Sequence, residues 1–217
     1  MKRYTNYSFL LLALLLLVAC GGGKKSEKQG RSSEYVTNNE AIRLNNAGYE
    51  LMMEFADQTD SVAKAYAMFQ QAHKLDKQYE LIYYNIAKAQ ILLKKYDEVA
   101  HTYDQIIALN TEMPDPYVYK GMFFDWREDS VQAKSYYNTA LKLLEGGILN
   151  GKGNQLTDEL SVCLVYFLLN DSTRLSLEYN RLTQKYAQDS INLEFVANMK
   201  AQTDSITKEE LINGLFE

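Results

Sequence analysis

Few residues of this sequence stand in a pattern that catalysis requires. Residues 146–153 come close to the phosphate-binding pattern G-x4-G-K-[ST], but Gly153 stands where the pattern needs a hydroxyl residue to hold magnesium. These residues also follow a segment with helical periodicity, whereas a phosphate-binding loop follows a strand. We therefore interpret residues 146–153 as a long connector after a helix that ends near Leu144.

Other reactive side chains are scattered along the chain. His73 and His101 have no cysteine or carboxylate at metal-ligand spacing, so neither predicts a metal site. The acidic pairs at 158–159 and 209–210 precede helical patterns, where negative charge favours the helix dipole without catalysis. Because no nucleophile stands beside a base, we expect a protein that is not an enzyme and binds no metal or cofactor.

The two cysteines differ in their surroundings. Cys163 lies between Val162 and Leu164 in a helical pattern, which is typical of a small buried residue. Cys20 ends an apolar run, and its distance from Cys163 gives no reason to expect a disulfide.

The start of the chain has the pattern of a secretory signal. Lys2 and Arg3 precede an apolar run over residues 9–19, which is shorter than the roughly 20 residues that a membrane-spanning helix needs. The run ends in Leu17-Val18-Ala19-Cys20, which resembles the lipobox of bacterial lipoproteins. The resemblance implies that residues 1–19 are removed and that Cys20 carries a diacylglycerol group and an N-acyl chain such as palmitate. Several acyl chains would make this membrane anchor durable.

Residues 20–39 read as the lipidated cysteine and a flexible, polar tether. A glycine directly after Cys20 resembles lipoproteins of the outer membrane. We expect a periplasm-facing protein there, with surface exposure as the open alternative.

Composition favours a helical and folded body. The chain of 217 residues is 47% hydrophobic and has only two prolines, which leaves long stretches free for helix. Its formal net charge of −5 disfavours nucleic acid as a partner.

A period of 34 residues runs through the middle of the chain. One helical face recurs at this period with spacings of four, three and three residues. Its three copies are Ala65, Phe69, Ala72, Leu75; Val99, Tyr103, Ile106, Leu109; and Ala133, Tyr137, Ala140, Leu143. The helix before each copy also recurs, with small residues at Ala87 and Gly121 where two helices must approach closely.

These patterns resemble the tetratricopeptide repeat, a pair of antiparallel helices. The resemblance implies an all-α fold, an α-α superhelix, with about four repeats over residues 40–186 and capping helices over 187–217. It places Cys163 at the small site of a further repeat. The proline that commonly closes each repeat is absent at Lys77, Thr111 and Glu145, so the repeat is divergent.

Helix starts are marked by a recurring dipeptide. Asp-Ser pairs precede helical patterns at 60/61, 129/130, 171/172, 189/190 and 204/205, where the aspartate side chain can cap free backbone amides. Thr207 and Glu210 have the spacing of a capping box.

In tetratricopeptide arrays, the first helices line a concave surface. The resemblance therefore implies a groove for a partner, and the residues it would contain are Asn45, Tyr49, Met52, Tyr84, Lys88, Ile91, Val118, Met122 and Asp125. Their mainly apolar and aromatic types favour a peptide with apolar side chains. Burial of this face by neighbouring repeats or by self-association is the open alternative.

The function that these features predict is that of an outer-membrane lipoprotein that acts as a protein-interaction adaptor or scaffold in an envelope complex. Its expected partners are envelope proteins or their peptide segments, with the membrane reached through the lipid anchor. The alternative is a solute- or glycan-binding lipoprotein of a nutrient-uptake system.

Overall fold

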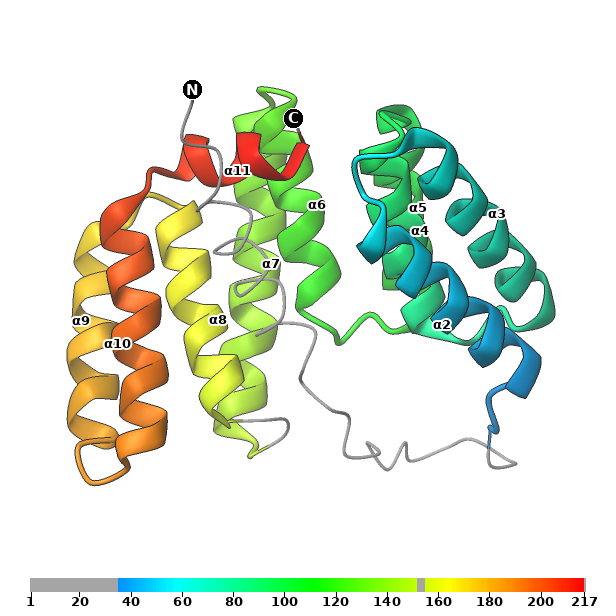
Figure 1. Ribbon diagram of the computed structural model, residues 1–217. Coiled ribbons are helices and arrows are strands. Elements are labelled where there is room, and N and C mark those ends of the chain that lie inside the picture. The colour runs from blue at the N-terminus through cyan, green and yellow to red at the C-terminus, as the bar shows by residue number, and fades with distance from the viewer. Residues whose placement is uncertain (1–34, 152–154, 217) are drawn as a thin grey trace. The chain divides into compact units, whose positions relative to one another are not determined.

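A computed structural model describes residues 35–151 and 155–216, and in these ranges the chain is all-α, with helices and no strands (Figure 1). The expected signal peptide, Cys20 and most of the expected tether lie outside the described residues. The described chain forms two compact units, divided between Pro116 and Tyr117, and each is considered by itself.

The first unit is a stack of two helical hairpins. Its helices are α2 (Asn39–Glu54), α3 (Thr59–Leu75), α4 (Glu80–Leu92) and α5 (Tyr96–Leu109). Each helix packs against the next, and the two first helices, α2 and α4, also contact each other. The core is apolar and includes Phe69 and Met52, both fully buried. Leu75, expected on the buried face of α3, is exposed because it lies at the last residue of that helix.

The residues before α2 are attached to the end of α3. Asp76 accepts hydrogen bonds from the Tyr35 hydroxyl at 2.6 Å and from the Asn38 backbone N–H at 2.9 Å. Asn38 in turn caps α2, since its Oδ1 accepts from the N–H groups of Glu40 and Ala41. The last residues of the expected tether therefore contact the folded unit.

The second unit continues the same plan. Its helices are α6 (Asp115–Trp126), α7 (Ser130–Leu149), α8 (Gln155–Leu168), α9 (Ser172–Lys185), α10 (Ser190–Ser205) and α11 (Lys208–Phe216). From α7 to α10 each helix packs on the next, and α8 also contacts α10. Two units of consecutively packed hairpins make this a helical-repeat protein, as the 34-residue period predicts.

Glycines bring the helices of two hairpins together. A Cβ added to Gly48 would lie 2.8 Å from Cε1 of Phe69, and one added to Gly121 would lie 2.4 Å from Cε1 of Tyr137. No larger residue fits at that distance without a shift of the ring. The prediction that Gly121 occupies a site of close helix approach is confirmed.

Three of the five Asp-Ser pairs cap helices as predicted. Asp129, Asp171 and Asp189 each accept from the backbone N–H three residues later, at 2.9–3.0 Å. The other two predictions are wrong: Asp60 lies inside the first turn of α3, and Asp204 lies in the last turn of α10.

The capping box of α11 is confirmed. The Thr207 hydroxyl accepts from the Glu210 N–H at 3.1 Å, and the Glu210 carboxylate accepts from the Thr207 N–H at 2.8 Å.

Helix α7 is longer than the sequence suggested. The predicted stop near Leu144 is wrong, because the helix continues through Gly146 and Gly147 to Leu149. It ends where Gly151 adopts a φ of +63°, a conformation that glycine adopts without strain. Among the described residues, no helix has the length and apolar character needed to cross a bilayer.

Candidate functional site

The predicted groove residues of α2 divide between core and surface. Asn45 and Met52 belong to the buried stripe of this helix together with Ala41 and Gly48, at spacings of four, three and four. Such spacing keeps one face of a helix against its neighbour, so Asn45 and Met52 face the interior. Tyr49 remains 38% exposed.

Helix α4 contributes three further accessible residues of the predicted groove in the first unit. Tyr84, Lys88 and Ile91 are each partly exposed. Lys88 meets α2 at Met53 rather than Met52: its Nζ lies 3.1 Å from the Met53 sulfur and 5.8 Å from the centre of the Tyr49 ring. We call the group Tyr49, Met53 and Lys88 the Lys88 patch. Sequence reasoning missed Met53. Helical periodicity could have found it, because Met53 directly follows Met52, the last residue of the buried stripe, and so points away from the core.

The electrostatics of Lys88 distinguish this patch from an ordinary solvated surface. A thioether is a weak acceptor, and a tyrosine ring attracts a cation only modestly. Burial lowers the pKa of Lys88, which means that the environment disfavours the charged form. An anionic group placed against this ammonium would relieve that penalty.

Beneath the Lys88 patch, two asparagines join α2 to α4. Asn85 Nδ2 donates to Asn45 Oδ1 at 2.7 Å, and both side chains are buried. A buried amide pair is stable only in the matching register of the two helices, so this bond fixes how α2 and α4 present the patch.

The predicted groove residues of α6 are covered in the second unit. Val118 and Met122 are buried, and the Asp125 side chain is 10% exposed. Asp125 Oδ2 accepts from the Tyr137 hydroxyl at 2.9 Å and pairs with Lys208 Nζ of α11 at 3.0 Å. The structure therefore brings the α6 residues into contact with α11, which the sequence did not predict.

A polar hollow in the first unit was also missed. It has a volume of about 420 Å³ and lies between α3 and α5, with α4 as its floor. Its polar lining includes His73, His101, Gln70, Gln90, Glu98 and Thr102. The two histidines that looked unrelated in the sequence thus line one hollow. In the described part of the chain, no three histidine, cysteine or acidic residues gather to hold a metal ion.

The hollow has a partly fixed hydrogen-bond pattern. Gln90 accepts from Thr102 at 2.8 Å and donates to Glu98 at 3.2 Å. The Tyr83 hydroxyl donates to the Lys77 carbonyl, so its oxygen accepts from Nε2 of His73 at 2.9 Å. Burial lowers the pKa of His73, which keeps the imidazole neutral near pH 7.

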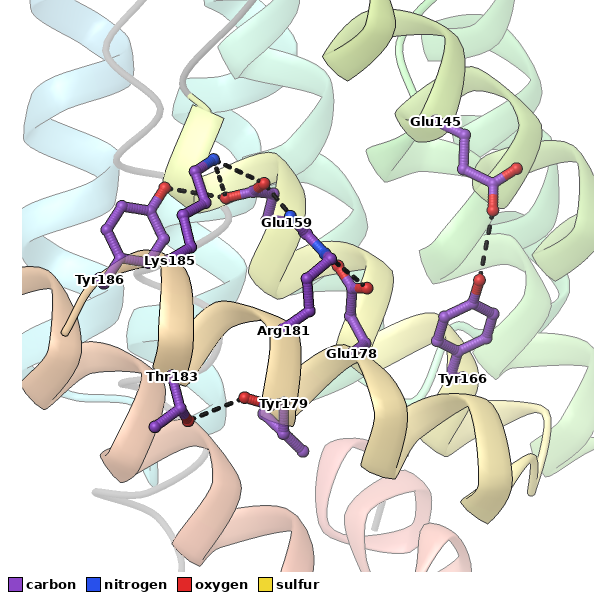
Figure 2. Close-up of polar contacts among 9 residues, drawn as sticks. All are labelled: Glu145, Glu159, Tyr166, Glu178, Tyr179, Arg181, Thr183, Lys185 and Tyr186. Carbon is purple, nitrogen blue, oxygen red and sulfur yellow. Dashed lines mark hydrogen bonds and ion pairs between the residues drawn. The ribbon is translucent and has the colours of Figure 1, made fainter.

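A dense charge cluster joins α8 to α9 (Figure 2). Glu159 is fully buried and accepts from Lys185 Nζ at 2.8 and 3.0 Å, from Arg181 Nη2 at 2.9 Å and from the Tyr186 hydroxyl at 2.8 Å. Burial alone would raise the pKa of Glu159, but these donors lower it overall. A carboxylate so fully occupied holds two helices together and leaves little acceptor capacity for a substrate.

Cys163 is fully buried on α8. Burial strongly raises the pKa of its thiol, so the thiolate needed for nucleophilic or redox chemistry does not form near neutral pH. The prediction of a small buried residue is confirmed. Cys20, the predicted lipidation site, lies outside the described residues.

Comparison with known proteins adds little to this site. No family model matches the chain, and no curated protein matches it either. A solved structure described as the "CopN-Scc3 complex" is similar to this chain with a TM-score of 0.43 and 14% sequence identity. The alignment covers 62% of this chain and 88% of that one. A likeness this low does not bear on function.

Proposed function

We propose that this chain is a tetratricopeptide-like lipoprotein that binds other envelope proteins as an adaptor or scaffold and has no catalytic activity of its own. The observation that carries the proposal is the Lys88 patch: a lysine, a tyrosine and a methionine held on one face of two packed helices. Stacked hairpins that leave such a face accessible are suited to binding extended or helical peptides.

The chemistry of the patch defines the peptide it would accept. Tyr49 and Met53 offer apolar, adaptable contact surface, and Lys88 offers an ammonium that contacts the Met53 thioether. A peptide with apolar side chains beside an acidic group would satisfy both. The buried Asn45–Asn85 bond supports this role, because it holds the two helices in one register before a partner arrives.

The test is a crosslinking pull-down from membranes with the variant Lys88→Glu, Tyr49→Ala. Charge reversal and loss of the ring should reduce partner capture strongly, while the helix content and melting temperature stay close to those of the unaltered chain. The matched control is Lys64→Glu, which reverses an exposed charge on α3. Met122, also predicted in the groove, is unsuitable for substitution because it is buried. Equal capture by variant and control would refute the patch as the binding site.

We further propose that Cys20 anchors the chain in the outer membrane through diacylglycerol and an N-acyl chain, with the folded part facing the periplasm. The support is the residue pattern Leu17-Val18-Ala19-Cys20 and the glycine that follows it. Labelling cells with an alkynyl fatty acid should mark the unaltered chain and leave the Cys20→Ser variant unmarked. Label on the variant would exclude this anchor, and protease digestion of intact cells would distinguish a periplasmic from a surface-exposed body.

The polar hollow favours a second candidate, the binding of a small neutral solute such as a sugar. The amides of Gln70 and Gln105, the His73 imidazole and the carboxylates of Asp97 and Glu98 supply donors and acceptors of the kind that hydroxyl-rich ligands need. Native mass spectrometry of the purified chain would reveal a retained saccharide. The variant His73→Ala, Gln70→Ala should release it. A chain that carries no solute and shows no shift with added saccharides would eliminate this candidate.

A further inference from the structure

The C-terminal helix does not take the place that the repeat gives to the second helix of a hairpin. It turns away from α10 and runs to α6, more than 80 positions back in the sequence (Figure 1). Ala197 of α10 occupies the position that is buried in the earlier hairpins at Ala87 and Cys163, yet it is exposed. The face of α10 that a hairpin partner would cover is thus left open in favour of a contact with α6.

The contact between α11 and α6 is made at both ends of α11. Lys208 in its first turn pairs with Asp125 at 3.0 Å, and both side chains are largely buried. Phe216 in its last turn stacks on Trp126, with ring centres 5.2 Å apart and an interplanar angle of 22°. The same ring meets Phe123 edge-on at 5.9 Å. Leu211 and Ile212 are buried between these ends, so α11 presents an apolar face bounded by a cation and an aromatic ring.

The α6 side of this contact is held in place independently of α11. Asp125 also accepts from the Tyr137 hydroxyl, and Tyr137 is buried in the hairpin of α6 and α7. Without Lys208, Asp125 would keep this bond but lose a cation that offsets its charge. A poorly hydrated carboxylate of this kind favours the return of a positive group.

Helix α11 has little stability apart from its contacts. It has nine residues, whereas isolated helices shorter than about 12–15 residues are marginal in water. It also contains Gly214, exposed in its last turn, and glycine is a weak helix former. The helix is therefore formed mainly because it is docked, and it is suited to open locally while the hairpins stay folded.

We infer that α11 is an internal occupant of a partner-helix site on α6. An amphipathic helix of a partner protein takes its place. That helix carries a basic residue that pairs with Asp125 and, about two turns later, an aromatic residue that stacks on Trp126. This inference rests on the proposed protein-binding function. It specifies which residue types a partner needs in order to bind the predicted groove residues of α6. The chain's own C-terminal helix then competes with the partner and limits binding.

The first test needs no substitution. Hydrogen exchange of the full chain, purified in detergent, should show amides of α11 exchanging through local opening, much faster than those of α7 and α8. Exchange of α11 only together with α7 and α8 would overturn the inference, because the helix would then be a fixed part of the fold.

The second test uses a peptide of residues 206–217 and the fluorescence of Trp126, the only tryptophan in the chain. The variant Lys208→Glu, Phe216→Ala should release α11 from α6. Trp126 then becomes more exposed to water, so its emission should shift to longer wavelength, and added peptide should reverse that shift. The intact chain should bind the peptide at least about tenfold more weakly, because a tethered α11 competes at an effective concentration near the millimolar range. Glu209→Gln, on the exposed face of α11, is the matched chain control and should behave as the intact chain.

A peptide carrying the same Lys208→Glu and Phe216→Ala changes should not bind. Equal peptide binding by intact and released chains, or binding by neither, would overturn the inference. Loss of amide protection in α6 and α7 of the variant Lys208→Glu, Phe216→Ala would also overturn the inference, because α11 would then be needed for the fold. Partner capture through the Lys88 patch is measured in a separate experiment. The peptide can therefore bind α6 when the Lys88 patch captures no partner, and the patch can capture a partner when the peptide does not bind.

Discussion

Helices α4 and α6 hold equivalent positions of the 34-residue period, but their predicted groove faces have different environments. Lys88 of α4 corresponds to Met122 of α6, and Ile91 corresponds to Asp125. On α4 the lysine is accessible beside Tyr49 and Met53, whereas on α6 the methionine is buried and the aspartate is paired with α11. The comparison teaches that position in the repeat sets the direction of a side chain, while elements outside the pattern decide whether a partner can reach it.

The largest expected effect compares the close helix contacts of the two units. Gly121→Ala should destabilise the second unit by about 3 kcal/mol, because the new methyl would overlap the fully buried Tyr137 ring. Gly48→Ala should cost the first unit about 1 kcal/mol, since the overlap with Phe69 is smaller. Hydrogen exchange resolved by helix would measure each unit separately.

Gly146→Ala provides the control for those two substitutions. Nothing lies within 4 Å of the added methyl, and the residue is inside α7. Alanine should therefore stabilise the helix by about 0.5 to 1 kcal/mol through propensity alone. Equal effects of alanine at all three glycines would contradict the assignment of Gly48 and Gly121 to close contacts.

Each unit also uses an aspartate to hold a terminal segment, Asp76 for residues 35–38 and Asp125 for α11. Asp76→Ala removes the acceptor for the Tyr35 hydroxyl and the Asn38 N–H, and should cost the first unit about 2 kcal/mol. Faster hydrogen exchange at the start of α2, with the second unit unaffected, is the expected signature. Tyr35→Phe removes one of these bonds and should have a smaller effect in the same place.

A smaller effect separates the aspartates that cap helices from those that do not. Asp171→Ala should destabilise α9 by about 1 kcal/mol, because it removes the acceptor for the Arg174 N–H. Asp60→Ala, inside the first turn of α3, should cost less than about 0.5 kcal/mol. Urea denaturation of the two variants would rank them, and the reverse order would show that the Asp-Ser pattern has another role.

The smallest effect is a response to pH that differs between the units. Burial, with the charge of Glu159, raises the pKa of Asp158 to about 6, above its value in the unfolded chain. The folded second unit then binds a proton that the unfolded chain releases, so its stability should rise as pH falls from 7 to 5. For this half-exposed group we expect about 0.5 kcal/mol after allowance for solvent screening.

Asp158→Asn should abolish that rise, and thermal melts at the two pH values would measure it. The first unit should respond in the opposite direction and at lower pH. Burial alone would raise the pKa of Asp76, but hydrogen bonds from Tyr35, Asn38 and Gln78 lower it overall. Its contribution to stability is therefore lost only as pH falls below the usual range of a carboxyl group.

Helical periodicity predicted the helices and much of the core, because packing of repeated hairpins imposes a regular pattern. Local signals were less reliable. The glycines at 146 and 147 suggested a helix end, yet α7 continues through them to Leu149, and it still contacts α8 beyond Leu144, where Glu145 accepts from the Tyr166 hydroxyl at 3.2 Å. Asp60 resembles the capping aspartates in sequence but falls inside a helix that starts earlier, at Thr59.

The candidate site was predicted less well, since exposure depends on contacts between distant parts of the chain. On α2, Met52 of the predicted groove is buried, and the methionine that contacts Lys88 is Met53, one position later. The pairing of α11 with α6 has no sequence signal, because it joins Lys208 to a residue of another hairpin. The polar hollow was likewise invisible, as its lining comes from three helices.

The hairpin of α2 and α3 has one further consequence. Gly48 still makes a close contact with Phe69, although 21 positions separate them and only 16 separate Gly121 from Tyr137. Additional residues at this turn have therefore been absorbed without loss of helix contact. The turn between Glu54 and Thr59 is accordingly a suitable place to insert an epitope tag, which would follow the protein in cells while both chain ends stay unmodified.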